Sequence, residues 1–270
     1  MNAFFQALET LRQKPIPDLE PLQRRKKNYR THPIDKTSKL YGEKLVEIRE
    51  LGIEGENYYS RTDNPPYYAA VPGSIDTLFL RESAAIRLRT VDQRLREFGL
   101  RLHVHDAIRP LAVQSYFHDV WMYRRIEERH PGLSREQIVA EVEKYWAAPT
   151  ASQDSPAPHS TGGAVDLTIC KMRNGGPLYM GSIFDDATEL AHTDYFEIAG
   201  RKPQAIEAKA SLENFSDAEA KQNRRLLYWL MLEAGFANNP NEWWHFSWGD
   251  QMWAKLTGAK AAVFGPAKDA

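Results

Sequence analysis

The chain of 270 residues contains a single cysteine, Cys170. An intramolecular disulfide therefore cannot form, and a zinc site built from several thiolates is excluded. Cys170 lies in the apolar run AVDLTIC, which favours a buried and inert thiol over a nucleophile.

Long apolar runs are also lacking. The longest strong one, LLYWLML at 226–232, is much shorter than the ~20 residues that span a bilayer. The N-terminus has no basic region followed by an apolar one, so no signal peptide is predicted. The formal net charge is −1, which gives no bulk electrostatic basis for nucleic acid or an anionic membrane as a partner. We expect a cytoplasmic protein.

Several common catalytic motifs are missing as well. The sequence has no His-Glu-x-x-His, no Walker-type Gly–Lys loop, no Gly-x-Ser-x-Gly and no Gly-x-Gly-x-x-Gly. One short segment, RRKKNYR at 24–30, is locally basic. A solvated surface segment is the favoured interpretation of this stretch, and a binding patch is the alternative.

Helical and alternating apolar patterns are mixed along the chain without βαβ regularity. We expect an α+β fold, a single domain with a small, mostly antiparallel sheet flanked by helices. Capping boxes are predicted at Ser134–Gln137 and Ser216–Glu219. The expected organisation is an N-terminal arm at 1–40, the main domain at 41–255 and a C-terminal tail at 256–270. Helices are predicted at 83–98, 111–129, 135–147 and 216–236, and strands from 100, at 164–169 and at 243–248.

His159 and Asp166 are the most informative polar pair. The two glycines between them allow a tight turn, so His159 can fold back over the strand that bears Asp166. Asp166 alternates with apolar neighbours and must therefore face water, a cation or a donor. Two histidines and one aspartate would make a zinc site with an open position, which is the arrangement of catalytic sites. His245, on a strand with an apolar reverse side, is the candidate third ligand.

Glu242 precedes His245 by three residues in NEWWHFSWGD. Strand parity places it on the opposite side, but the turn before the strand can bring it to the same site. There it could take a proton from a metal-activated water and deliver it to a leaving amine. His103 and His105, in HVHD, form a competing pair that could share one ion. A polar strand face is the plainer interpretation of that pair.

Five segments, in order, resemble the signature elements of the D-alanyl-D-alanine dipeptidases of the VanX type. YSRTDN, DAIRP, SPAPHSTGGAVDLTI, MGSIFDD and EWWHF are similar to that family's Tyr-x-x-x-Asp-Asn, Asp-Ala-Tyr-Arg-Pro, Ser-x-His-x-x-Gly-x-Ala-x-Asp, Met-Gly-x-x-Phe-Asp and Glu-x-x-His elements. The resemblance implies the zinc D,D-peptidase fold, one Zn²⁺ per chain and a small dipeptide substrate. His159, Asp166 and His245 match the zinc ligands, and Glu242 matches the catalytic base.

The resemblance also implies residues that contact the substrate. Arg109 matches the arginine that stabilises the tetrahedral intermediate. Asp185 matches an acidic residue that receives the free amino group of the substrate, and Tyr59 matches a tyrosine near that end of the pocket. The family commonly has a serine where this chain has Ala157, a departure that bears on substrate preference.

The expected activity is zinc-dependent hydrolysis of D-Ala-D-Ala or a closely related D,D-dipeptide. Two alternatives are open at this point. One is a D,D-carboxypeptidase or endopeptidase that acts on peptidoglycan stem peptides. The other is a non-catalytic binding module with the same fold, although an intact Glu242 argues against it because a pure binder has no use for a base.

Overall fold

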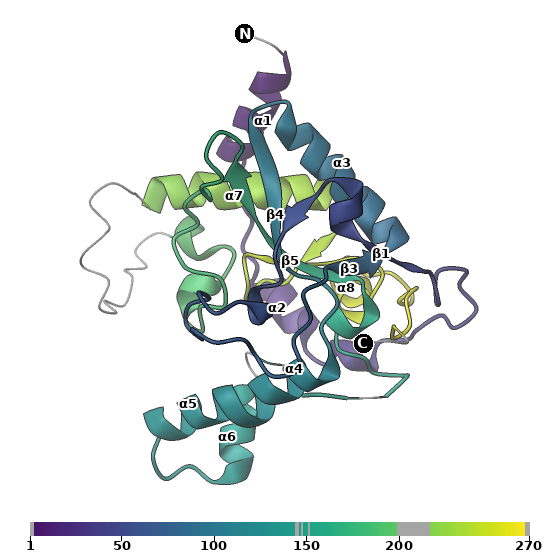
Figure 1. The fold of residues 1–270 in the computed structure, drawn as a ribbon, viewed down its shortest axis with the longest axis vertical. Coiled ribbons are helices and arrows are strands. Elements are labelled where there is room, and N and C mark those ends of the chain that lie inside the picture. Colours follow the sequence, from purple (N-terminus) through teal and green to yellow (C-terminus); the bar gives the residue numbers. More distant parts are fainter. Residues whose placement is uncertain (1–2, 144–145, 147, 151, 199–216, 268–270) are drawn as a thin grey trace.

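A five-stranded sheet lies at the centre of the computed structural model, which describes residues 3–143, 146, 148–150, 152–198 and 217–267 (Figure 1). The strand order is β2-β4-β5-β7-β6, and of these pairs only β2–β4 is parallel. The mostly antiparallel sheet of the predicted α+β fold is therefore confirmed. A separate antiparallel pair joins β1 to β3. The strands are β1 (Leu45–Glu47), β2 (Glu54–Gly55), β3 (Phe79–Arg81), β4 (Leu100–Asp106), β5 (Ala164–Lys171), β6 (Ala237–Asn238) and β7 (His245–Ser247).

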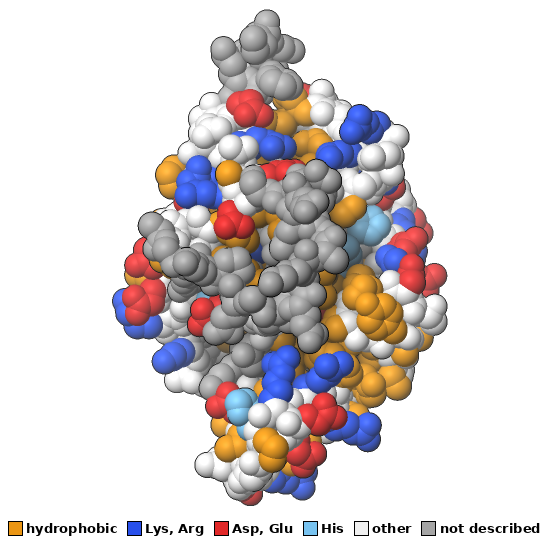
Figure 2. Space-filling view, turned by 90° about the vertical axis from the view of Figure 1, so that its left-hand side faces the viewer, with side chains coloured by type: hydrophobic (Ala, Val, Ile, Leu, Met, Phe, Trp, Pro, Cys, Tyr) orange, Lys and Arg blue, Asp and Glu red, His pale blue; other side chains and the backbone are white. Residues whose placement is uncertain are grey.

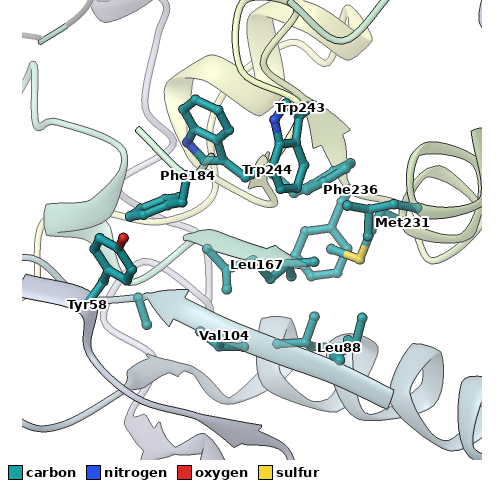
Figure 3. Close-up of a cluster of buried hydrophobic side chains, with 14 of the residues drawn as sticks. Tyr58, Leu88, Val104, Leu167, Phe184, Met231, Phe236, Trp243 and Trp244 are labelled. Carbon is teal, nitrogen blue, oxygen red and sulfur yellow. The ribbon is translucent and has the colours of Figure 1, made fainter. Parts of the chain in front are cut away.

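Helices cover one face of this sheet and bury the main core against it. Figure 3 shows Leu88 of α3 and Met231 of α7 packed over Val104 of β4 and Leu167 of β5. Helices α5 and α6 form a projecting lobe away from the sheet (Figure 1). No helix within the described ranges is long and apolar enough to cross a membrane. The α-helices are α1 (Ala3–Gln13), α2 (Glu20–Lys26), α3 (Glu82–Arg96), α4 (Leu111–Tyr116), α5 (Met122–Arg129), α6 (Arg135–Val142), α7 (Asp217–Glu233) and α8 (Gln251–Thr257).

The local signals in the sequence place most helices well. The capping box of α6 is present, because Ser134 accepts from the Gln137 amide and the Gln137 side chain accepts from the Ser134 amide. The helix expected at 111–129 is continuous but contains a π-helical turn at Phe117–Trp121 between α4 and α5. Ser216 lies outside the described residues, so its cap on α7 stays a prediction.

The N-terminal arm is helical and is docked on the C-terminal half of the chain. Helix α1 packs against α7, and α2 packs against α8. The contact of α2 with α8 is apolar, since Leu22 of α2 packs against the cluster that contains Met252 and Leu256 of α8. The surface in Figure 2 mixes acidic and basic side chains on this view of the molecule, in keeping with the small net charge.

The segment that follows α8 is bound into the core. Phe264 is fully buried and its ring lies 5.2 Å from that of Trp248. The Phe264 amide donates to the Gly249 carbonyl at 3.0 Å, and the Ala267 amide donates to the Ser160 carbonyl at 2.8 Å. The tail therefore packs directly behind the loop that carries His159.

Replacing Phe264 with alanine is expected to destabilise the protein by about 3–5 kcal/mol, because a buried aromatic ring is lost and a cavity is left. Denaturant unfolding followed by tryptophan fluorescence measures the change. Lys260→Ala, an exposed change in the same segment, is the control and should stay within about 0.5 kcal/mol of the wild type. Equal stability of the two variants would show that the tail is dispensable for folding.

Candidate active site

The register of three neighbouring strands brings polar side chains together on the face of the sheet that does not carry the main core. Asp166 of β5 lies opposite His245 of β7 on one side and Asp106 of β4 on the other. Regular pairing of Val104 with Leu167 would place His105 opposite Asp166. A register shift between Val104 and Asp106 places Asp106 there instead, as a β-bulge does when it re-aims a side chain.

The bulge also determines where the side chains of the competing histidine pair, His103 and His105, lie. The His105 ring is half-buried between aromatic neighbours, 5.5 Å from Tyr58 and 4.9 Å from Phe184. Burial lowers the pKa of His105 to about 3, so the ring is neutral. Among the described residues, the grouping of side chains able to hold a metal includes neither His103 nor His105. The sequence favoured a polar strand face for this pair; the His105 ring instead packs against aromatic side chains.

His159 reaches the site from a single 3₁₀ turn, His159–Thr161, that ends at Gly162 with a φ of 73°. A side chain at Gly163 would meet the Trp248 carbonyl oxygen at 2.5 Å, so the second glycine allows the turn to lie against the next strand. His159 Nδ1 lies 2.7 Å from the Ala107 carbonyl oxygen. Because a carbonyl only accepts, Nδ1 carries the proton and Nε2 presents its lone pair to the site.

His159, Asp166 and His245 meet with geometry that suits one divalent ion. His159 Nε2 lies 3.2 Å from His245 Nδ1 and 3.3 Å from an Asp166 oxygen, and the other Asp166 oxygen lies 3.0 Å from His245 Nδ1. Ligands held tetrahedrally at 2.0–2.1 Å from Zn²⁺ are separated by roughly 3.3 Å. The three residues are at most 4% exposed, and two imidazoles with one carboxylate are a donor set that zinc accepts.

The electrostatic surroundings keep this carboxylate ionised. Burial acts to raise the pKa of Asp166, but His159 and His245 outweigh it and lower the pKa below the usual range. Burial likewise acts to lower the pKa of His245, and Asp166 reverses this effect and raises it. A negative carboxylate between two imidazoles is the charge arrangement that a cation requires.

Arg109 is held rigidly beside the cluster. Its guanidinium donates to Asp106 at 2.9 Å, to Gln114 at 3.1 Å, and to Tyr59 and Asp166 at 3.2 Å each. Burial acts to lower the pKa of Arg109, but Tyr59 and Asp106 outweigh it and raise the pKa. The guanidinium is therefore a fixed positive charge at the wall of the cleft.

Asp185 lies within a cage of tyrosines and is one hydroxyl away from Arg109, because the Tyr59 hydroxyl accepts from Arg109 and donates to Asp185. One of its oxygens accepts from the Tyr59 hydroxyl at 2.9 Å and from the Tyr67 hydroxyl at 2.8 Å. The carboxylate remains partly exposed to the cleft. Burial and the charge of Asp166 raise the pKa of Asp185 well above its ordinary value, although Arg109 and both hydroxyls oppose this.

Glu242 does reach the site from the turn before β7. Its amide donates to the Asn239 carbonyl at 3.0 Å, which closes the turn, and one carboxylate oxygen lies 3.7 Å from His245 Nδ1. The Asn239 side chain donates to the same oxygen at 2.8 Å. The Glu242 side chain is 24% exposed, so it faces the cleft from beside the cluster.

These groups share one cleft of about 690 Å³, which is lined by the His-Asp-His cluster, Arg109, Asp185 and Glu242 among other residues. The structure thus brings together the residues that the sequence indicated, with Tyr59 behind Asp185. It adds Asp106, Tyr67 and Asn239, which sequence reasoning did not assign. Asp106 begins the DAIRP segment, so the motif itself held the signal; Tyr67 and Asn239 show no such pattern.

A buried cluster of two histidines and one aspartate, at the wall of an open cleft with a free carboxylate beside it, is the arrangement of a metal-dependent hydrolase. Comparison with known proteins narrows this class. The model of the M15 peptidase family, described as D-ala-D-ala dipeptidase, matches residues 51–259. The chain belongs to this family of metallopeptidases.

Curated relatives agree with this assignment. The chain is 35% identical over 223 residues to a D-alanyl-D-alanine dipeptidase of Synechocystis sp., an alignment that covers 79% of this chain and 85% of the relative. It is 24% identical over 200 residues to a D-alanyl-D-alanine dipeptidase of Enterococcus faecalis, covering 74% and 88%. A solved structure of VanYB in complex with D-Alanine-D-Alanine aligns with 86% of this chain and 94% of its own, at 13% identity and a TM-score of 0.40.

Proposed function

We propose that the chain hydrolyses D-Ala-D-Ala, or a closely related D,D-dipeptide, with one Zn²⁺ held by His159, Asp166 and His245. The observation that carries this proposal is the spacing of the three ligand groups, 3.0 to 3.3 Å apart, in a chain whose curated relatives are named D-alanyl-D-alanine dipeptidases. We keep residues 41–255 as the proposed catalytic domain.

A zinc ion bound there would polarise the scissile carbonyl and make water a nucleophile at neutral pH. Glu242 is placed to accept the proton of the attacking water and to deliver it to the leaving amine. Its hydrogen bond from Asn239 holds one oxygen and leaves the other for this transfer. Arg109, fixed by four acceptors, faces the oxygen on which negative charge develops and stabilises it.

Asp185 is the proposed anchor for the ammonium group of the dipeptide. Tyr59 and Tyr67 occupy one of its oxygens, so the second oxygen is available to the cleft. A longer peptide has an uncharged amide in place of the ammonium and would leave this carboxylate desolvated and unpaired. The tyrosine cage therefore supports preference for a substrate with a free amino end.

The test of the proposed function combines metal analysis of the purified protein with release of D-alanine from D-Ala-D-Ala, with and without chelator. We expect about one zinc per chain and hydrolysis that stops on chelation and returns with added zinc. Faster cleavage of an acyl-tripeptide ending in D-Ala-D-Ala would identify a carboxypeptidase instead. Bound zinc with no hydrolysis of either substrate would identify a binding module.

Replacing Asp185 with asparagine is expected to raise KM for D-Ala-D-Ala by about 10–100-fold, because a hydrogen bond between charged groups is worth about 1.5–3 kcal/mol. The pH profile supplies a second measurement. Since the pKa of Asp185 is raised, the carboxylate loses its proton only as pH rises, and kcat/KM of the wild type should rise with it. The variant should lack this rise.

Asp186→Asn is the matched control, because Asp186 lines the same cleft and its side chain accepts from the Thr188 amide, which asparagine can also do. It should keep the wild-type KM and pH profile. If D185N and D186N behaved alike, Asp185 would not be the ammonium anchor.

A further inference from the structure

The N-terminal arm contributes a wall to the catalytic cleft. Helix α2 ends at Lys26, and Lys26, Tyr29 and Arg30 all line the cleft that contains the His159–Asp166–His245 cluster. The family match begins at residue 51, so this wall is built from chain outside the matched region. The basic stretch at 24–30, interpreted from the sequence as a solvated surface segment, is thus partly turned inward.

Lys26 is connected to Glu242 through a single side chain. Its ammonium donates to Asn239 Oδ1 at 2.8 Å, and Asn239 Nδ2 donates to Glu242 Oε2 at 2.8 Å. Asn239 is 4% exposed, and its backbone amide donates to the His245 carbonyl at 3.0 Å. The ammonium is therefore held one amide group away from the Glu242 oxygen that lies 3.7 Å from His245 Nδ1.

Among the described residues, Lys26, Arg30 and Arg109 line the cleft, and they differ in the number of donors already used in hydrogen bonds. Arg30 donates from Nε and both terminal nitrogens to the carbonyls of Ala148 and Ser155. Arg109 is bound by four acceptors. The Lys26 ammonium has three donors, and Asn239 takes one of them. Burial lowers the pKa of Lys26 against the opposing effect of Glu242, which marks a partly desolvated cation.

We propose that Lys26 is a specificity residue that receives the C-terminal carboxylate of the substrate. The proposal rests on the proposed dipeptidase function and extends it to the second end of the substrate. Asp185 and Lys26, of opposite charge, then read the two ends of one dipeptide in the same cleft. A peptide extended at its C-terminus presents an amide to Lys26 and loses this contact.

The chemistry of the leaving group agrees with the position of the lysine. Glu242 has to approach the leaving nitrogen in order to protonate it, and the carboxylate carbon of the leaving D-alanine lies about 2.5 Å beyond that nitrogen. The Lys26 ammonium, one amide group away from Glu242, is therefore close to the expected position of this carboxylate. Ala157, whose side chain offers no donor, also lines the cleft.

The experiment compares D-Ala-D-Ala with its C-terminal carboxamide on zinc-loaded, full-length wild type, Lys26→Met and the matched control Lys27→Met. Lys27 follows Lys26 directly and is exposed. In K26M we expect KM for the free acid to rise about 10–100-fold, the loss of one charge-assisted hydrogen bond, with the carboxamide unaffected and kcat largely kept. K26R should recover part of the loss, and K27M should match the wild type.

A role for Lys26 in positioning Glu242 alone would lower kcat equally for both substrates, and that result overturns the proposal. So does an unchanged KM for the free acid in K26M. If K26M does not fold, K26Q, which can still donate to Asn239, replaces it with the same expectation.

A binding measurement separates this inference from the proposed function. The ligand is a D-Ala-D-Ala analogue with a methylene in place of the scissile carbonyl, titrated as free acid and as carboxamide by calorimetry. If the wild type hydrolyses nothing but binds the acid more tightly than K26M does, the dipeptidase function fails and the role of Lys26 stands. If wild type and K26M bind the acid equally, or neither binds it, the role of Lys26 fails.

Discussion

Glutamine in place of Glu242 is expected to lower kcat for D-Ala-D-Ala by about 10²–10⁴-fold, the usual contribution of a positioned acid–base group, while zinc stays bound. Glu242 lies next to His159, Asp166 and His245 but does not belong to this group of candidate ligands. The amide of glutamine keeps an oxygen for the hydrogen bond from Asn239 but cannot carry a proton between water and amine. Steady-state kinetics with metal analysis of the same sample make the measurement.

Glu189→Gln is the control for this prediction, because Glu189 is an exposed carboxylate that lines the same cleft. Its kcat should equal that of the wild type. Near-normal turnover by E242Q would remove Glu242 from the mechanism, and loss of zinc from E242Q would make it a metal ligand.

Asparagine in place of Asp166 is expected to abolish both zinc binding and hydrolysis. Asp166 contacts His159, His245 and Arg109 at the same time. Loss of a partner behind a ligand already weakens metal binding by about 10–100-fold, so loss of a ligand should weaken it further. Competition with a fluorescent zinc chelator measures the affinity.

Asp92→Asn is the control for this prediction, because it makes the same substitution at a buried aspartate away from the cleft. Asp92 is 2% exposed, compared with 1% for Asp166, and holds Arg96 and the Leu102 amide on the helical side of the sheet. D92N should lose stability but keep one zinc per chain. A D166N protein that still held stoichiometric zinc would contradict the His159–Asp166–His245 site.

Local sequence signals predicted those parts of the fold that depend on neighbouring residues. The alternation Val165, Leu167, Ile169 sets which face of β5 is buried, and all three are 0% exposed. Helix α3 follows its apolar spacing, and α6 follows its capping box. The helices of the arm were not predicted. Helix α2 has only seven residues, and so short a helix depends on docking rather than on its own propensity.

The residues of the site likewise fall into those that a local motif indicated and those that only tertiary packing brings together. Ordered motifs indicated His159, Asp166 and His245 together with Glu242 and Arg109, because each lies in a segment with a recognisable pattern. Asp106 lies in the DAIRP motif, but its position opposite Asp166 depends on a bulge, which regular alternation along β4 cannot reveal because it is a property of the pairing with β5. Lys26 and Asn239 were missed because they are 213 positions apart, and only tertiary packing brings them together.

Asp166 and His245 are paired across β5 and β7. The proposed metal site therefore forms only when these two strands are correctly aligned. Sliding β7 by one position would send the His245 imidazole into the apolar layer under α7 and would leave the aspartate without its partner. The proposed zinc ion would therefore bind tightly only after distant parts of the chain have reached their final alignment. Scarcity of zinc should then lower the temperature at which the whole domain melts, rather than loosening one surface loop.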